Sequence, residues 1–393
     1  MINIVKPEIQ GRVREMQLSH VRKILKKLVQ AGKDTDVISF GGGTPFLKPP
    51  ELFSQKINSV FSEFKSHTYG VTAGLGELRE LIALELQGEG FKDARAENVL
   101  VTSSSTNGLD AAMETLLGKG DELVIASPYF VNFTGQFKLR ELKVKKVETS
   151  VEEGYRLGSE ALKEAITKKT KAILAVSPDN PTGRVLSAEE VKTMGDLAVD
   201  NGAVVFADEA YYKVLFAKKH YKFTDYLDNV VGLRSYSKTT SMPGWRLGYN
   251  YASKEVVEQM EKVNSVKVVC PNMLGQRLLV EYYKDETARR EYDALILREY
   301  SKRREAMSSA LKEYLPEAKV VEPEGGFYFF LKLPGKIQDD EAFSDKAFSE
   351  QKVAVVPGSA FGVGKGEGYF RFSFVSESPE RIREGVKRIG NLL

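Results

Sequence analysis

Short apolar runs alternate with helical patterns through the middle of the chain. Most of the runs are near-continuous Val, Ile, Leu and Ala, which is typical of strands covered on both faces. Helical patterns such as residues 109–117 and 188–201 lie between them, and Ser187 with Glu190 predicts a capping box at the second. We expect seven strands, at residues 98–104, 122–127, 143–148, 171–177, 203–208, 230–235 and 246–252. This alternation predicts an α/β fold whose large domain has a mostly parallel seven-stranded sheet flanked by helices.

After Lys254 the pattern changes to long, charged helices, with a continuous helical signal over residues 286–314. Short strands are then expected at residues 326–333, 353–356 and 369–375. These elements predict a smaller α+β domain built from both ends of the chain. We expect the large domain at residues 46–280 and the small domain at residues 1–45 together with 281–393.

Size and charge narrow the classes of protein that fit. The 393 residues exceed what one hydrophobic core usually serves, in agreement with two domains. Fifty-seven Lys and Arg residues oppose 54 Asp and Glu residues, and no block of like charge stands out. We therefore expect no nucleic-acid and no membrane partner. No run approaches the roughly 18 apolar residues of a membrane helix, and the first residues carry charges throughout, so no signal peptide is expected.

Cysteine and histidine are sparse. Cys270 is the single cysteine, so no disulfide can form within the chain, and a reducing cytoplasm is the expected location. Because free cysteines are often buried, we expect Cys270 to be a small hydrophobic core residue rather than a nucleophile. His20, His67 and His220 are far apart and show no ligand spacing, which predicts that there is no metal site.

Lys238 lies just past the end of a predicted strand, in the segment SYSKTTSMPGWRLG at residues 235–248. A lysine at the end of a buried strand is costly unless it is paired or used covalently. A Schiff base to an aldehyde is one such use, and the neighbouring hydroxyls together with Arg246 could bind a phosphate dianion. On spacing alone, a solvated lysine in a surface loop is an equally good interpretation.

Two more segments follow predicted strands, where the ligand sites of open α/β sheets collect. They are SPDNPTG at residues 177–183 and ADEAY at residues 207–211. Each also has an ordinary interpretation, the first as a Pro/Gly turn and the second as a helix-capping aspartate. Together with the Lys238 segment, and in this order along the chain, they resemble the class I/II aminotransferases, which are fold-type I enzymes that use pyridoxal 5′-phosphate (PLP).

By this resemblance Lys238 carries PLP as an aldimine, and Ser235 and Arg246 bind its phosphate. Asp208 pairs with the pyridinium nitrogen, so that the protonated ring acts as an electron sink. Glu209 is its neighbour in an extended segment, where adjacent side chains point to opposite faces, and the resemblance selects Asp208. Lys238, Asp208 and Tyr211 are the residues to which the resemblance assigns catalytic roles.

The resemblance places further residues around the cofactor. Asn180 and Tyr211 hydrogen-bond the PLP 3′-oxygen, and an anion cradle with Ser105 and Thr106 opens a helix, where relatives usually have more glycine. Aligned by its proline, SPYF at residues 127–130 puts Phe130 on the pyridine ring. Tyr129 takes that place if the register slips by one residue.

Substrate and subunit contacts are implied in the same way. Gly43 in SFGGGTP approaches the substrate with a backbone amide, and Asn180 lies near the substrate carboxylate. Arg371 in YFRFSF grips that carboxylate with two hydrogen bonds, although an edge-strand arginine in water is the ordinary alternative. Tyr69 reaches the phosphate of a neighbouring subunit, which implies a homodimer with active sites at the subunit interface.

The implied activity is transfer of the amino group of an L-amino acid to a 2-oxo acid such as 2-oxoglutarate. The alternative is β-elimination by a carbon–sulfur lyase, since Lys238, Asp208 and Arg371 would serve either reaction. A regulator with an aminotransferase-like domain is disfavoured because only about forty residues precede Gly41. A nucleotide-binding enzyme is disfavoured because no strand-to-helix G-x-G-x-x-G context surrounds the glycine run.

The amino donor stays open among aspartate, alanine, aromatic amino acids, 2-aminoadipate and a broad range. Some aspartate-specific relatives have a lysine near the phosphate cradle, where this chain has Thr106 and Asn107. This argues mildly against a lysine-type aspartate site, although another residue or the partner subunit could supply the charge.

Overall fold

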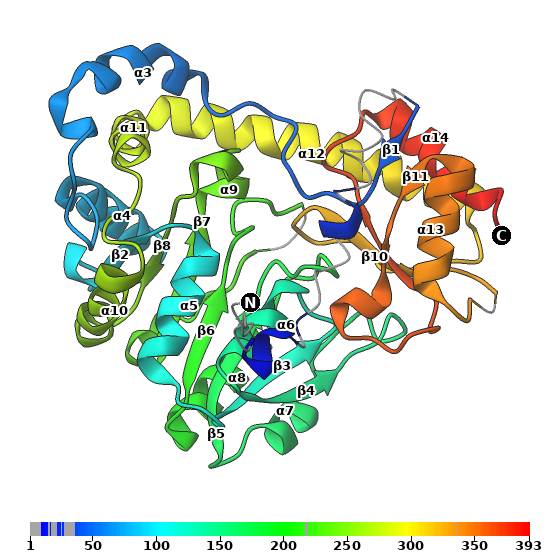
Figure 1. Ribbon diagram of the computed structural model, residues 1–393, viewed down its shortest axis with the longest axis horizontal. Helices are drawn as coiled ribbons and strands as arrows, with labels where there is room; N and C mark the ends of the chain where they lie inside the picture. The colour runs from blue at the N-terminus through cyan, green and yellow to red at the C-terminus, as the bar shows by residue number, and fades with distance from the viewer. Residues whose placement is uncertain are drawn as a thin grey trace, which may run out of the picture.

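A mostly parallel sheet of seven strands forms the large part of the molecule (Figure 1). The computed structural model describes residues 9–14, 16, 22–24, 26, 36–216, 219–335 and 337–393. The strand order is β2-β8-β7-β6-β5-β3-β4; β8 is antiparallel to both neighbours and the other pairs are parallel. The predicted fold class is confirmed. The strands are β2 Val99–Thr102, β3 Glu122–Ser127, β4 Lys143–Glu148, β5 Thr170–Val176, β6 Val204–Asp208, β7 Val230–Ser235 and β8 Gly248–Tyr251.

Helices cover both faces of this sheet. Ile173 of β5 packs in the cluster that contains the buried residues of α4 and α8, whereas its neighbour Leu174 packs in the cluster of α5 and α10. Phe206 belongs to the second cluster, and Asp208, two residues on, points to the same face because side chains alternate along a strand. The helices are α4 Gly76–Gly88, α5 Ser105–Leu116, α8 Ala188–Asn201 and α10 Lys254–Lys267.

The C-terminal part contains a four-stranded antiparallel sheet in the order β12-β13-β10-β9. The predicted long helix is observed as α12 and packs against α14, while β9 was not predicted from the sequence. These elements are β9 Lys319–Val320, β10 Tyr328–Lys332, β12 Val356–Pro357, β13 Tyr369–Ser373, α12 Glu286–Tyr314, α13 Asp340–Gln351 and α14 Pro379–Gly390.

The N-terminal segment contacts both parts of the molecule. β1 (Ile38–Ser39) pairs in parallel with β11 (Val353–Ala354) of the C-terminal part. In contrast, α1 (Gly11–Arg14) lies against α6 (Asn132–Leu139), where Arg12 Nη1 donates to the Leu139 carbonyl at 3.2 Å. Many of residues 1–35 lie outside the described part, and the domain boundaries stay a prediction.

Long connections join the two parts. Figure 1 shows α12 running from the region of α3 and α11 to the C-terminal sheet, so that one rigid helix spans both parts. α3 is Glu51–Ser62 and α11 is Met273–Lys284. The described residues contain no helix long and apolar enough to cross a membrane.

The expectation for Cys270 is modified by the structure. This residue is half-buried rather than a core residue, because it lies in the connection after α10, where its Sγ accepts from the Gly70 backbone amide at 3.4 Å. Within the described residues no group of three His, Cys, Asp or Glu side chains is placed to hold a metal ion. His20 lies outside the described residues.

The predicted capping box at α8 is present. Ser187 Oγ accepts from the Glu190 amide at 3.2 Å, and Glu190 Oε2 accepts from the Ser187 amide at 2.8 Å. We expect Ser187→Ala to lower the free energy of unfolding by about 1 kcal/mol, because one helix N–H loses its acceptor. Urea unfolding measures this, with Ser349→Ala on the exposed face of α13 as a control that should change little. An equal loss in both variants would contradict the assignment to the cap.

Candidate active site

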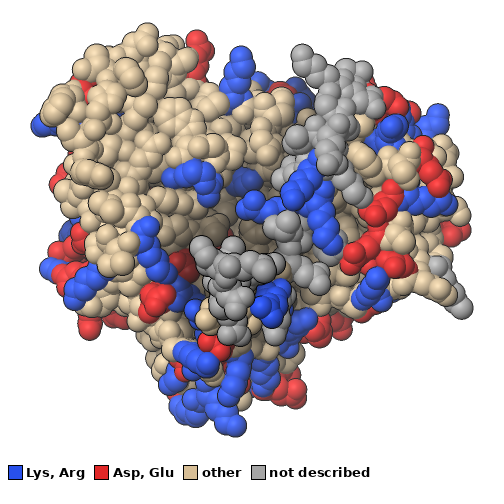
Figure 2. Space-filling view, in the orientation of Figure 1, with Lys and Arg blue, Asp and Glu red and all other residues tan. Residues whose placement is uncertain are grey.

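A cavity of about 260 Å³ lies where the carboxyl ends of β5, β6 and β7 face the C-terminal sheet. Figure 2 shows a hollow near the middle of this face, with Lys and Arg side chains above it. The structure brings together in this cavity every site residue predicted from the sequence except Tyr69. These residues are Gly43, Ser105, Thr106, Phe130, Asn180, Asp208, Tyr211, Ser235, Lys238, Arg246 and Arg371.

Lys238 lines the cavity from the short helix α9 (Tyr236–Thr239), which begins directly after β7. Its Nζ donates to the Gly43 carbonyl at 2.6 Å. Burial lowers the pKa of Lys238, and the positive charges of Arg371 and Arg246 lower it further. A lowered pKa favours the neutral amine, which is the nucleophilic and basic form of a lysine.

Asp208 ends β6 and is a carboxylate without a cation. Its Oδ1 accepts from the Ala210 amide at 3.0 Å, and no ion pair to it is present among the described residues. Burial raises its pKa to about 7, and the negative charges of Glu209 and Asp179 act in the same direction. The neighbouring Glu209 points away from the cavity to Arg234, with 2.7 Å between Oε2 and Nε. Of this acidic pair, Asp208 therefore faces the cavity.

An anion cradle forms at the start of α5. Ser104 precedes the helix with a φ of 86°, a left-handed value that glycine adopts more easily, and its side chain does not cap the helix. The first amides of this 12-residue helix therefore remain as donors beside Ser105 and Thr106. From the other side, Ser235 and the exposed Arg246 line the same cavity. Hydroxyls, helix amides and an arginine converge here as a phosphate group requires.

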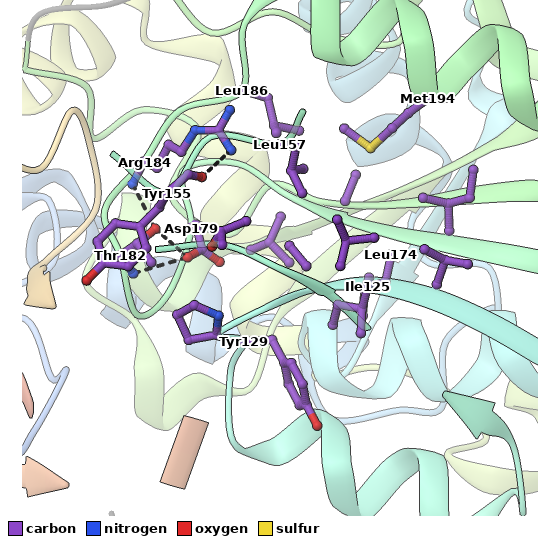
Figure 3. Close-up of a pocket in the computed structure, with 18 of the residues that line it drawn as sticks. Ile125, Tyr129, Tyr155, Leu157, Leu174, Asp179, Thr182, Arg184, Leu186 and Met194 are labelled. Atoms are coloured by element: carbon purple, nitrogen blue, oxygen red, sulfur yellow. Dashed lines mark hydrogen bonds between the residues drawn. The ribbon is translucent and has the colours of Figure 1, made fainter. Parts of the chain in front are cut away.

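The choice between two adjacent aromatic residues is decided by their positions. Phe130 lines the cavity and contacts Phe133 edge-on, with 5.4 Å between ring centroids. Tyr129 is buried behind it, where its amide donates to the Phe361 carbonyl at 2.9 Å. Its ring lies beside a second, much smaller cavity (Figure 3). A group bound in the large cavity therefore meets Phe130 and not Tyr129.

The second cavity is too small for an amino acid. Its volume is about 30 Å³, close to the space of one water molecule, and most of its walls are apolar. Asp179 lies at its edge, where Oδ2 accepts from the Thr182 hydroxyl at 2.6 Å and from the Thr182 amide at 3.1 Å (Figure 3). Burial raises the pKa of Asp179 to about 6. These bonds close the turn that carries Asn180.

Arg371 reaches the cavity from β13 and is buried, with 2% of its surface exposed. Nη1 donates to Asn180 Oδ1 at 3.0 Å and Nη2 donates to the Gly41 carbonyl at 2.9 Å. Among the described residues no carboxylate contacts the guanidinium, and Nε has no hydrogen-bond partner. Burial lowers the pKa of Arg371, but a guanidinium stays charged in proteins. A buried arginine with a free donor suits a carboxylate ligand.

Sequence reasoning did not identify Tyr328. This residue begins β10, and its hydroxyl lies 3.0 Å from the hydroxyl of Tyr211 inside the cavity. In the sequence it belongs to the aromatic run GFYFF, which is typical of a core strand. The sequence holds no local signal for this residue, because its place beside Arg371 comes from the pairing of β10 with β13.

Tyr69 lies outside the cavity. Its side chain is 87% exposed, and Phe64 and Val71 nearby in sequence are 81% and 62% exposed. Within a single chain this tyrosine contributes nothing to the site described above.

The chain is similar to one family of known proteins over nearly its whole length. The family model described as aminotransferase class I and II matches residues 35–389. The chain is 32% identical to aspartate aminotransferase of Pyrococcus horikoshii, over 98% of this chain and 97% of the relative. It is 30% identical to aromatic-amino-acid aminotransferase 2 of Thermococcus litoralis, over 98% of each chain.

A solved structure of a double mutant of Thermus thermophilus aspartate aminotransferase has the same fold. Its TM-score is 0.91 at 27% identity, over 99% of this chain and 100% of that one. The family model and the relatives each span nearly the whole chain. This protein therefore belongs to the class I and II aminotransferases and is a PLP-dependent transaminase.

Proposed function

We propose that this enzyme carries PLP on Lys238 and moves the amino group of an L-amino acid to a 2-oxo acid, with 2-oxoglutarate as the acceptor. The observation that carries the proposal is the set of unpaired charges in one cavity. Lys238, Asp208 and Arg371 all face it, and among the described residues none of the three has an oppositely charged partner there.

The residues of the cavity fit PLP. Asp208 has a raised pKa that a cation would lower, and the pyridinium nitrogen of PLP is such a cation. The amides of α5, Ser235 and Arg246 suit the phosphate dianion, and Phe130 offers a flat apolar ring for the pyridine. When bound, PLP supplies an electron sink for the negative charge that develops at the substrate Cα.

The chain itself positions the substrate and moves the proton. Arg371 and Asn180 hold the α-carboxylate of the amino acid, so that one Cα substituent is fixed in direction. Lys238, with its lowered pKa, takes the Cα proton as general base. Asp208 would hold the proton on the pyridine nitrogen, so that the cofactor ring can accept the negative charge that develops at Cα.

The choice of the amino-donor substrate depends on one end of the cavity. This end lies near Thr106, Asn132 and Gln136 and presents neutral polar groups. Relatives of similar identity are named for aspartate and for aromatic amino acids. We therefore propose a donor range that includes more than one class of side chain.

We also propose a homodimer in which Tyr69 completes the site of the partner subunit. The Tyr69 loop adjoins the segment after α10, since the Gly70 amide lies 3.4 Å from Cys270 Sγ. Val266 and Val269 of that region are 85% and 50% exposed. Figure 2 shows few charged side chains over the corner formed by α3 and α11. An apolar exposed surface of this kind is typical of a subunit interface.

Replacing Lys238 tests the function directly. We expect Lys238→Ala to lower amino-group transfer at least about a thousandfold, because both the cofactor anchor and the general base are lost. The assay incubates a panel of L-amino acids with 2-oxoglutarate and measures glutamate. Lys168→Ala is the matched control, because Lys168 is an exposed lysine outside the cavity, and it should keep full activity.

Two results would contradict this proposal. Pyruvate and ammonia formed without any acceptor would indicate β-elimination instead of transfer. A purified protein without visible PLP absorbance, together with full activity of Lys238→Ala, would exclude the assigned role of the lysine.

Asp208 should oppose folding of the cofactor-free protein at neutral and higher pH. Its pKa in the folded protein, about 7, lies above the ordinary value of 3.8. The free-energy cost of folding with an ionised Asp208 therefore grows as pH rises from about 4 to about 7, and it is constant above that. Asp208→Asn should stabilise the apoprotein at pH 8 by an amount on the order of 1–3 kcal/mol and change little at pH 4. Thermal unfolding at both pH values measures this. Added PLP should reverse the order of stability at pH 8, and an unchanged order would count against the Asp208–pyridinium pair.

Mixing two impaired variants, at a PLP concentration too low to fill the Tyr69→Ala site, tests the shared site. Tyr69→Ala should weaken PLP binding, and Lys238→Ala should abolish transfer. When the two are unfolded and refolded together, mixed dimers contain one site with both Lys238 and Tyr69 intact, so activity should return to about a quarter of the wild-type value by random pairing. No recovery, with dimers present by light scattering, would show that Tyr69 does not act across the interface.

A further inference from the structure

Tyr328 is held beside Arg371 by the register of two strands. In the antiparallel pair of β10 and β13, Tyr328 lies opposite Ser373 and Phe330 lies opposite Arg371. Tyr328 and Arg371 are therefore diagonal neighbours on one face of the sheet. The guanidinium carbon lies 4.1 Å from the centroid of the Tyr328 ring, which is the geometry of a cation–π contact.

The Tyr328 hydroxyl contacts the other side of the cavity. It lies 3.0 Å from the Tyr211 hydroxyl. It also packs against Gly43 so closely that a Cβ at that residue would collide with the Tyr328 oxygen. The Gly43 carbonyl in turn accepts from Lys238 Nζ. The hydroxyl is thus surrounded by three of the residues on which the proposed function depends.

The groups around the two tyrosines shift their pKa values in opposite directions. Burial alone would raise the pKa of Tyr328, but the positive charges of Arg371 and Lys238 and the hydrogen bond with Tyr211 lower it below the usual value. The pKa of Tyr211 is raised, by burial first and then by Tyr328. Either hydroxyl has a proton to give, and the more acidic Tyr328 hydroxyl is the better donor to Tyr211.

We propose that Tyr328 is a positioning residue that links the carboxylate-binding Arg371 to the cofactor-binding Tyr211. The ring of Tyr328 supports the guanidinium group, and its hydroxyl forms a hydrogen-bonded chain with Tyr211. This inference rests on the proposed function, because it is there that Tyr211 binds the cofactor and Arg371 binds the substrate.

The hydrogen-bonded chain suits a cofactor oxygen at Tyr211. A phenol has one proton, so Tyr211 can donate to the cofactor 3′-oxygen only if it accepts from Tyr328. Tyr328 is placed to be that donor, and its bond to Tyr211 strengthens the donation from Tyr211 to the cofactor.

Two variants of the holoenzyme separate the tasks of ring and hydroxyl. Tyr328→Phe keeps the ring, so the KM for the amino donor should stay within about twofold, whereas kcat should fall about three- to tenfold. The pH midpoint of the visible PLP absorbance should rise by about half a unit, because the 3′-oxygen anion loses support. Tyr328→Leu also removes the ring, and the KM should then rise by about tenfold.

Controls make the outcome specific. Tyr282 on α11 is a buried tyrosine whose hydroxyl has no hydrogen-bond partner among the described residues, and it lies outside the cavity. Tyr282→Phe should leave the midpoint and kcat unchanged. If the two hydroxyls act as one chain, Tyr211→Phe combined with Tyr328→Phe should shift the midpoint no further than Tyr211→Phe alone. Thermal unfolding of each holoenzyme checks that the variants are folded.

A wild-type midpoint and kcat in Tyr328→Phe, or fully additive shifts in the double variant, would overturn the proposed link. Failure of the proposed function looks different, because the wild-type protein would then show no PLP absorbance and no transfer.

Discussion

Burial of charge without an opposite charge is the constraint on which the active site depends. Arg371 is buried and Asp208 and Lys238 are partly buried, and an ionised group in such surroundings is costly unless something compensates it. Asp208 responds with a raised pKa and Lys238 with a lowered one. Arg371 cannot lose its proton and instead donates to neutral oxygens of Asn180 and Gly41. The site is therefore preorganised for ligands that bring the missing charges.

Buried charges in the neighbouring parts of the fold are compensated within the chain. Arg234, which is fully buried, pairs with Glu209 at 2.7 Å and with Glu89 at 2.6 Å. Lys213 lies 3.1 Å from Glu85. These ion pairs fix the ends of β6 and β7 on the side away from the cavity. Asp208 and Lys238 therefore project into the cavity from a rigid support. The contrast with the cavity indicates that its unpaired charges serve function and not folding.

The C-terminal sheet contributes as much to the site as the large sheet does. Asp208 and Lys238 follow from parallel strands whose carboxyl ends meet at one edge, whereas Arg371 and Tyr328 come from antiparallel strands packed against that edge. Gly43 enters from the N-terminal segment, and β1 is tied to the same part through β11. The groups that we propose to bind substrate and cofactor are thus carried by separate elements that contact each other through Asn180 and the two tyrosines.

The amino-acid sequence by itself determined the seven-stranded sheet, the long helix α12, the capping box at Ser187 and the motifs that hold Lys238, Asn180 and Asp208, because each of these rests on neighbours in the chain. Only the tertiary structure decided the rest. Phe130 was preferred to Tyr129 only by the alignment of the neighbouring proline, and the packing of Tyr129 behind the cavity is what separates them. Tyr328 meets Tyr211 across 117 residues. Contacts of this kind depend on how two sheets pack, and no local pattern of residues records that.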